Sequence, residues 1–220
     1  MDGDLSEAVR RGLAYALDGR LAPHYERHLV HDCRYSTPQV LADALAGLAP
    51  PGGRFLDLGA GSGLVGEAAV DRGLALQFVA IDLSEAMLTL IDCTAYIDRR
   101  QADCTLALPY PDAWFDGAVA AGLLEHVPDP ARVFASVARA IRPGAPFLFT
   151  YPPNRFGRTE LIDTEQGLLS HDVDATSESL ETCGLCIAGE REYPAYLNGA
   201  KGWLTHRLVV CHRSAASDAK

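Results

Sequence analysis

Short apolar runs alternate with amphipathic helical segments along most of the chain. From residue 54, the runs RFLDL and LQFVAID precede the segments LVGEAAVDR and EAMLTLIDC. Short apolar strands that alternate with helices are typical of a parallel sheet with helices on both faces. A weak third strand ends near residues 101–104, and FDGAVAAG and PFLFTY continue the pattern as fourth and fifth strands. A helix that begins at Asp129 and Pro130 separates those last two strands.

The end of the chain departs from this alternation. We expect an irregular stretch from Pro152 to Asp174, a helix around Ser177 to Thr182, and then the strands LCIAGEREY and THRLVVC. Two consecutive closing strands imply that one of them runs antiparallel at the sheet edge. The predicted fold is therefore α/β, with a seven-stranded, mostly parallel sheet, one antiparallel edge strand and helices on both faces.

A helical preface occupies residues 1–50. Thr37 followed by Pro38 is a capping residue with proline at the first helical position, and the helix ends at the Pro-Pro-Gly-Gly breaker over residues 50–53. A length of 220 residues is that of one globular domain. We expect a single domain over 1–220, made of the preface, a core over 54–151, and a loop with closing strands over 152–212.

The composition and net charge of the chain argue against membranes and nucleic acids as partners. The chain is 48% hydrophobic and 22% charged, without an apolar run near the roughly 18 residues that a membrane span needs. Met1 to Leu17 lacks the apolar block of a signal peptide, so we expect a soluble, cytoplasmic protein. A net charge of −10 repels phosphate backbones, so nucleic acid is not an expected partner, and neither is a membrane.

The spacing of the cysteines matches only part of a metal-binding motif. Cys183 and Cys186 form a CxxC, but no second close pair stands at finger-like spacing, and apolar residues surround this one. We interpret both as small buried side chains at a helix-to-strand junction and predict no metal.

The strongest chemical signal is DLGAGSG, over residues 57–63, where the first strand meets the first helix. Glycines there let a ligand approach the backbone, and the helix N-terminus offers free N–H groups. A dinucleotide fingerprint starting at Gly59 needs glycine at position 64, where this chain has Leu64. Asp57 would also repel a pyrophosphate and tolerate a cationic ligand. A nicotinamide or flavin dinucleotide is therefore disfavoured.

Several segments together resemble the class I S-adenosylmethionine-dependent methyltransferases, over about residues 54 to 156. DLGAGSG is similar to that family's first motif, and Asp82 with Ser84, Ala86 and Met87 is similar to its "D.S..ML" segment. The blocks ADCTLALPYPDAWFDGAVAAGLLEHVPDP and ARAIRPGAPFLFTYPPNR also resemble family segments. The resemblance implies a Rossmann-like fold, S-adenosylmethionine as cofactor, S-adenosylhomocysteine as product, and methylation of a small molecule, in the methyltransferase type 11 or ubiquinone-biosynthesis-like branch.

The resemblance also implies the donor-binding residues. Asp82 would accept hydrogen bonds from both ribose hydroxyls, Asp103 would accept one from the adenine amino group, Cys104 would offer its backbone and Leu83 would pack on the ring. The full implied set is Asp57, Gly59, Ala60, Gly61, Gly63, Asp82, Leu83, Met87, Asp103, Cys104 and Ala121.

The acceptor side is less defined by the sequence. His126 follows the fourth strand and is the candidate catalytic base, with a structural role in fixing the loop as the alternative. Glu125 and His126 resemble the ExxEH pattern of magnesium-using relatives, but Gly122 stands at the first Glu position. The candidate substrate-binding residues are Tyr25, Tyr35, Tyr151, Asn154 and His171, with His28, His31 and Arg155 beside them. We expect the preface to act as a lid over this pocket.

Two other functions compete with methylation of a small molecule. One is a donor-binding protein of the same fold with a non-methylating or regulatory role. The other, a nucleic-acid amino methyltransferase, is disfavoured because Gly-Leu-Leu-Glu stands over residues 122–125 in place of an Asn/Asp-Pro-Pro-aromatic tetrad. The protein is expected to be a monomer or a homodimer.

Overall fold

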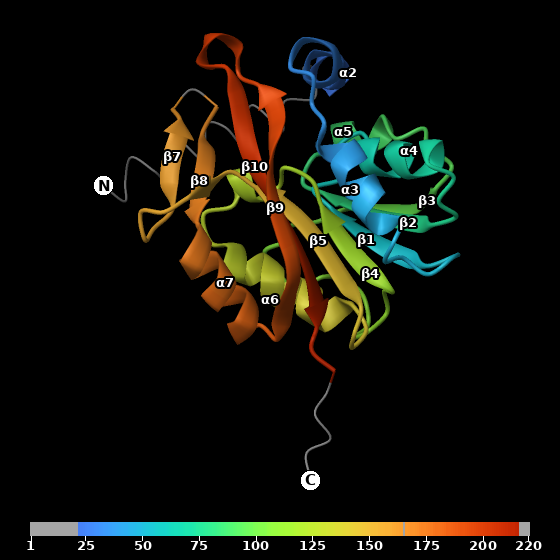
Figure 1. Ribbon diagram of the computed structural model, residues 1–220. Coiled ribbons are helices and arrows are strands. Elements are labelled where there is room, and N and C mark those ends of the chain that lie inside the picture. Colours follow the sequence, from blue (N-terminus) through green and yellow to red (C-terminus); the bar gives the residue numbers. More distant parts are fainter. Residues whose placement is uncertain (1–21, 165, 216–220) are drawn as a thin grey trace.

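The computed structural model describes residues 22–164 and 166–215. Its centre is a seven-stranded sheet in the order β3-β2-β1-β4-β5-β10-β9 (Figure 1). The strands are β1 (Arg54–Leu58), β2 (Gln77–Asp82), β3 (Tyr96–Gln101), β4 (Gly117–Ala120), β5 (Pro146–Tyr151), β9 (Leu185–Leu197) and β10 (Trp203–Arg213). Strands β1 to β5 are mutually parallel, and β10 is antiparallel to both β5 and β9. The expected Rossmann-like, mostly parallel sheet is confirmed.

The sequence suggested an antiparallel strand at the edge of the sheet, but in the structure the antiparallel strand β10 is second from the edge. β10 pairs with β5 on one side and with β9 on the other, so β9 is the outermost strand. A short connection through the 3-10 turn η3 (Gly199–Lys201) joins β9 to β10, so the two strands form an antiparallel hairpin. The hairpin folds back so that its second strand fills the place beside β5.

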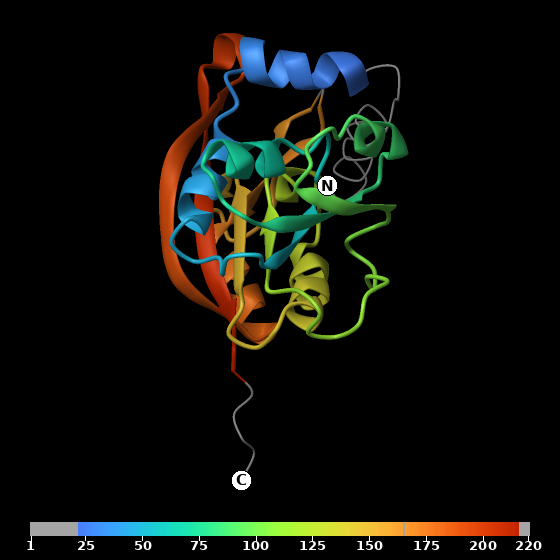
Figure 2. The ribbon, with the colours of Figure 1, turned by 90° about the vertical axis from the view of Figure 1, so that its right-hand side faces the viewer.

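Helices cover both faces of this sheet. On one face α3 (Thr37–Leu45), α4 (Leu64–Asp71) and α5 (Glu85–Thr89) pack through apolar residues such as Leu41, Val65 and Leu88 against Phe55 and Phe78. On the other face, α6 (Pro130–Ala140) and α7 (Val173–Thr182) belong to a second apolar cluster with the alternate strand residues (Figure 2). The central strands β1, β2, β4 and β5 therefore bury residues on both sides, which explains their continuous apolar pattern.

Two helix starts differ from the sequence expectation. The N-cap of α3 is Ser36, and Thr37 lies inside the helix, fully buried, with its hydroxyl 2.8 Å from the Tyr193 hydroxyl. Helix α7 begins at Val173, earlier than expected, because the Asp172 carboxylate accepts the free N–H groups of its first turn. Only the change at α7 follows from a side-chain cap, because the Ser36 hydroxyl makes no capping hydrogen bond and donates to the backbone carbonyls of Pro194 and Ala195.

The stretch from residue 152 to 172 is ordered into a small second sheet. Its strands are β6 (Pro153–Asn154), β7 (Glu160–Asp163) and β8 (Leu168–Asp172), in the order β6-β8-β7. The expectation of an irregular stretch was wrong here, because β8 is buried along its whole length despite its polar sequence LLSHD. Its polar side chains are satisfied locally, as by the Asn154 amide that donates to the Ser170 hydroxyl at 2.9 Å.

The preface is described from residue 22 onward, as α2 (Ala22–Arg27), a π-helical turn η1 (His28–Asp32) and α3. Figure 2 shows α2 lying across the end of the sheet at which β1 and β2 finish. The first 21 residues of the expected preface lie outside the described residues. Within the residues that the structure describes, no helix is long and apolar enough to cross a membrane.

A tight contact in the centre of the sheet gives a test of this packing. A Cβ added at Gly117 in β4 would stand 2.3 Å from Cε1 of Phe55 in β1, whereas one added at Gly189 in β9 would meet no heavy atom within 4 Å. Gly117→Ala should therefore lower the free energy of unfolding by about 1 to 3 kcal/mol through overpacking. Urea denaturation measures it, with Gly189→Ala as the control expected within about 0.5 kcal/mol of the parent. Equal stabilities for the two variants would contradict the packing described.

Candidate active site

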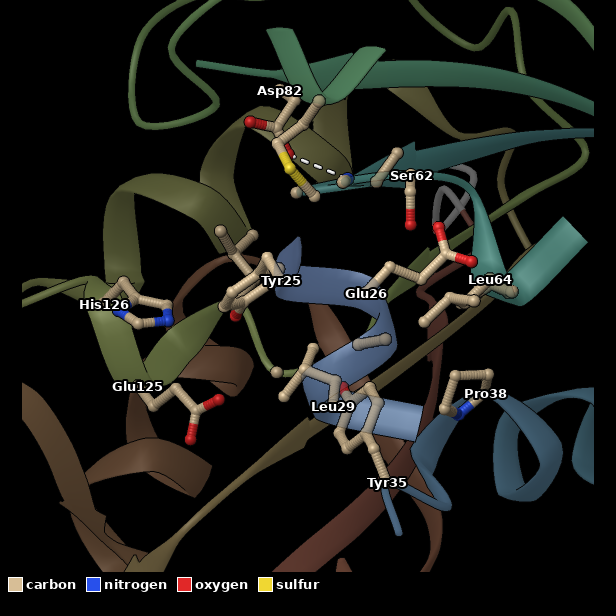
Figure 3. Close-up of a pocket in the computed structure, with 18 of the residues that line it drawn as sticks. Tyr25, Glu26, Leu29, Tyr35, Pro38, Ser62, Leu64, Asp82, Glu125 and His126 are labelled. Carbon is tan, nitrogen blue, oxygen red and sulfur yellow. Dashed lines mark hydrogen bonds between the residues drawn. The ribbon is translucent and has the colours of Figure 1, made fainter. Parts of the chain in front are cut away.

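A cavity of about 760 Å³ opens at the carboxyl ends of β1, β2 and β4 (Figure 3). Loops that follow parallel strands meet at this edge, which is where ligands bind in open α/β sheets. Ten of the eleven predicted donor-binding residues line it, namely Asp57, Gly59, Ala60, Gly61, Asp82, Leu83, Met87, Asp103, Cys104 and Ala121. Residues far apart in the sequence therefore share one cavity, as the strand order requires.

Gly63 is the predicted donor-binding residue that does not line the cavity. It has a left-handed φ of 90° and stands at the N-cap of α4, where a Cβ would lie 3.0 Å from the Tyr96 ring. Gly61 has a φ of 55° and lines the cavity. Gly61 therefore lets the loop present its backbone to a ligand, whereas Gly63 turns the chain into the helix.

Asp57 is the most deeply buried charged side chain of the cavity wall. Its Oδ2 accepts a hydrogen bond from the Tyr96 hydroxyl at 2.5 Å, and its Oδ1 has no hydrogen-bond partner in the part of the chain that the structure describes. Burial raises the pKa of Asp57 to about 7, against the opposing effect of the Tyr96 hydrogen bond. Tyr96 also accepts a hydrogen bond from the Gly66 N–H at 3.1 Å, so one tyrosine ties the carboxylate to α4. An unpaired buried carboxylate oxygen is a ready acceptor for a ligand's N–H group.

Asp82 fastens the glycine loop to the end of β2. Its Oδ2 accepts from the Gly61 N–H and its Oδ1 from the Ser84 N–H, both at 2.8 Å. Burial raises the pKa of Asp82, while these backbone hydrogen bonds act in the opposite direction. Ser84 caps α5 as expected, with its hydroxyl accepting from the Met87 N–H at 3.3 Å. Because a carboxylate offers about four acceptor positions, Asp82 can still bind a hydroxyl from the cavity.

The loop after β3 forms the next wall. Asp103 Oδ1 accepts hydrogen bonds from the Thr105 N–H at 2.8 Å and the Thr105 hydroxyl at 2.6 Å. Burial raises the pKa of the neighbouring Cys104 thiol to about 12, so this side chain is neutral and contributes an apolar surface. This wall therefore combines one carboxylate with apolar groups.

The opposite half of the cavity lies between the preface and the loop after β4. Figure 3 shows Tyr25 of the preface beside His126, whereas the Glu26 carboxylate extends toward Ser62 and Leu64. Glu125 and His126 belong to the 3-10 turn η2 (Leu124–His126), which directly follows the fourth strand's loop. Of the predicted substrate-binding residues, Tyr25 and Tyr35 line this half.

The other three predicted substrate-binding residues are not in the cavity lining. Tyr151 is 1% exposed and its ring lies between Phe149 and His171 in the apolar core, because its position in β5 faces the α6 and α7 layer. The Asn154 amide holds the second sheet together through Ser170. His171 Nε2 lies 2.8 Å from the carbonyl oxygen of Leu124, which fixes η2 from behind.

Two of the weaker candidates do not line the cavity either. His31 and Arg155 are both exposed and absent from its wall, whereas His28 lines it, with Nδ1 3.0 Å from Asp32 Oδ2. The sequence missed Ser62 and Leu123, and also Tyr196 and Asn198 at the β9–β10 turn, which all line the cavity. The turn residues carried no sequence signal, because they arrive through the hairpin that closes the sheet.

Among the described residues, no three His, Cys, Asp or Glu side chains lie close enough together to bind a metal ion. A Cβ at Gly122 would stand 2.8 Å from the Tyr35 hydroxyl and 3.0 Å from Glu125 Oε1, so a glutamate does not fit there. The CxxC does lie at the junction of α7 and β9, but Cys183 is half-buried and Cys186 is exposed, which corrects their expected burial.

The buried Asp57 gives a pH test on the unliganded protein. Its folded-state pKa is about 7 and its ordinary value is 3.8, so it favours the folded state below about pH 4 and that contribution is lost as the pH rises through 7. Asp57→Asn, which cannot ionise, should gain stability relative to the parent over this window, by about 4 kcal/mol at most. Urea denaturation between pH 4 and 8 measures the difference. A constant difference between the two proteins would show that Asp57 does not titrate in this range.

Comparisons with known proteins agree with this geometry. Residues 56–149 match the model of a methyltransferase domain family. The ubiquinone biosynthesis O-methyltransferase of Hahella chejuensis is 36% identical over 105 residues, which are 46% of this chain and 43% of that protein. The chain thus spans about half the length of the curated relatives that it matches.

Solved structures extend the similarity over most of the fold. An S-adenosylmethionine-dependent methyltransferase from Mesorhizobium loti has a TM-score of 0.59 and 26% identity, covering 78% of this chain and 96% of that one. The [4+2]-cyclase SpnF has a TM-score of 0.64 and 18% identity, covering 80% of this chain and 81% of that one. Residues 56–149 of this chain therefore match a methyltransferase domain, and its strand order is that of a Rossmann-like fold, which the solved structures share over most of the chain.

Proposed function

We propose that this protein transfers a methyl group from S-adenosylmethionine to a small-molecule acceptor. The observation that carries the proposal is the single cavity in which the glycine loop, Asp57, Asp82 and Asp103 meet at the ends of neighbouring strands. The donor has a cationic sulfonium, an ammonium group, a ribose and an adenine, and it has no phosphate. A cavity lined by carboxylates suits those groups and disfavours a dinucleotide.

The orphaned oxygen of Asp57 is the best test of whether the donor fits. Asp57 Oδ1 is buried, Asp57 lines the cavity, and no partner for this oxygen is found among the described residues. In our proposal it accepts a hydrogen bond from the donor's ammonium group, which also favours the ionised form of a carboxyl whose pKa is about 7. Asp82 would hold the ribose hydroxyls, and Asp103 and Cys104 the adenine, with Leu83 and Met87 packed beside it.

When bound, the donor supplies an electrophilic methyl group, and the protein supplies alignment and exclusion of water. His126 lines the cavity and is the proposed base that removes a proton from the acceptor. Tyr25, Tyr35 and the preface turn form the wall opposite His126. A lid role for the preface stays a prediction, as do the monomeric or homodimeric state and the cytoplasmic location.

A second function is a donor-binding protein that does not methylate. The specific observation in its favour is the fold shared with a [4+2]-cyclase, which shows that this architecture does not by itself imply methyl transfer. Release of S-adenosylhomocysteine during an acceptor screen separates the two. Donor binding without S-adenosylhomocysteine formation across a broad panel of phenols, amines and carbon acids would favour the second function.

Asp82 gives the first test of the donor site. Asp82→Ala should weaken S-adenosylhomocysteine binding about tenfold to a hundredfold, because the ribose loses a charged acceptor worth roughly 1.5 to 3 kcal/mol. Calorimetry measures the dissociation constant, and Asp71→Ala, at the exposed end of α4, is the matched control. An unchanged constant would mean that Asp82 only fastens the loop, and tight NAD binding by the parent protein would overturn the donor assignment.

His126 gives a test of the acceptor half. His126→Gln should lower the turnover number by about a hundredfold to ten-thousandfold if the imidazole is the base, while S-adenosylhomocysteine affinity stays within twofold. Rates are measured on the acceptor that the screen identifies, across pH 6 to 9. Full turnover in this variant would assign His126 to the structural role of fixing the loop.

A further inference from the structure

Glu125 is a deeply buried carboxylate whose two oxygens have different surroundings. Its side chain is 8% exposed, and it lines the acceptor half of the cavity. Oε2 accepts a hydrogen bond from the Tyr196 hydroxyl at 3.2 Å and lies 3.3 Å from His206 Nε2. No described residue donates a hydrogen bond to Oε1. One oxygen is therefore held by the protein, while the other has no donor among the described residues and is left for a ligand.

His206 is the imidazole that lies against the Glu125 carboxylate. It lies in β10, is fully buried, and has the rings of Tyr193 and Tyr196 edge-on at 6.3 and 5.6 Å. Its contact with Glu125 is an ion-pair distance without hydrogen-bond alignment. Burial is the largest single influence and acts to raise the pKa of Glu125, but His206, His126 and the Tyr196 hydrogen bond together outweigh it, so the pKa is lowered and the carboxyl is ionised.

The charge around the cavity is strongly one-sided. Its described lining includes the carboxylates of Glu26, Asp32, Asp57, Asp82, Asp103 and Glu125. No lysine or arginine is among the described residues that line it. An anionic group would meet this negative potential without a countercharge, and desolvation makes that cost larger than in water.

We propose that Glu125 recognises the acceptor. Its Oε1 accepts a hydrogen bond from an O–H or N–H group of a molecule that carries no anionic substituent, and His206 positions and charges the carboxylate. This inference deepens the proposed function and rests on it. It specifies that the methyl acceptor is a neutral or cationic molecule that donates a hydrogen bond. It also gives a role to His206, which does not line the cavity.

The test compares three ligands of one size on protein saturated with S-adenosylhomocysteine. Benzylamine, benzyl alcohol and benzoate share a ring and differ in charge. Ligand-observed NMR titration at pH 7.5 should give affinities in that order, with benzylamine at least tenfold above benzoate. Equal affinities, preference for benzoate, or binding of none of the three would overturn the proposal.

Variants then assign the preference to Glu125. Glu125→Gln keeps the shape and removes the charge, so the preference for benzylamine over benzoate should fall about tenfold. Glu178→Gln, the same change at an exposed position of α7, should leave the preference intact. A preference that survives in Glu125→Gln would assign it to the other carboxylates and overturn this role.

The role of His206 is tested by the pH dependence of ligand binding, which a general loosening of the packing in a variant would not change. In His206→Gln the pKa of the Glu125 carboxyl should rise, since only His126 and the Tyr196 hydrogen bond then oppose burial, so benzylamine binding should weaken between pH 7.5 and 5.5 more than in the parent. The titratable described groups that interact with Glu125 are His206, His126, Tyr196, Tyr193, Tyr35 and His171. All but His206 remain in the variant, and an unchanged pH dependence would remove His206 from the proposal.

Calorimetry of S-adenosylhomocysteine separates failure of this inference from failure of the proposed function. If S-adenosylhomocysteine binds and the charge preference is absent, only the role of Glu125 fails. If S-adenosylhomocysteine does not bind, the donor assignment fails, and the same three titrations on the unliganded protein still decide whether Glu125 selects against anions.

Discussion

The hydrogen bond between Asp57 and Tyr96 is the contact on which the donor end of the cavity depends. A carboxylate at the end of a buried strand is costly unless its oxygens are paired. Tyr96 pairs one oxygen and accepts from the Gly66 N–H, so β1, β3 and α4 are joined at one point. A Cβ at Gly66 would lie 2.3 Å from the Tyr96 ring, so this glycine is needed for the contact. The other oxygen stays free, and the cavity receives an acceptor that the fold itself does not use.

The carboxylates of Asp82, Asp103 and Glu125 are each stabilised by a different kind of partner. Asp82 is neutralised by backbone N–H groups that also shape the glycine loop. Asp103 is held by Thr105 in its own turn, and Glu125 by His206 and Tyr196 from the closing hairpin. Asp82 and Asp103 are held by backbone N–H groups at the donor end. Glu125 is held by the imidazole of His206, which is distant in the sequence. The acceptor end therefore depends on correct closure of the sheet.

Three separate parts of the chain build that acceptor end. The preface contributes Tyr25 and Tyr35, the loop after β4 contributes Glu125 and His126, and the hairpin turn contributes Tyr196. His171 of the second sheet supports the loop through the Leu124 carbonyl without reaching the cavity. The predicted donor-binding groups thus follow neighbouring strands, while the other half of the cavity also takes residues from the preface and the closing hairpin. This division explains how one core can serve different acceptors.

The sequence by itself determined the alternating core and the donor end. Strand and helix order, the glycine loop and the carboxylates at the strand ends are local features, and parallel strands bring their carboxyl ends to one edge whatever else the chain does. Ten of eleven predicted donor residues accordingly line the cavity. Tertiary structure alone decided the rest. Tyr151 and His171 share their residue types with Tyr25 and His126, but the face of β5 and the pairing of β8 turn the first two into the core. His206 and Glu125 meet only because β10 inserts beside β5, and no spacing in the sequence encodes a contact that depends on how a hairpin folds back.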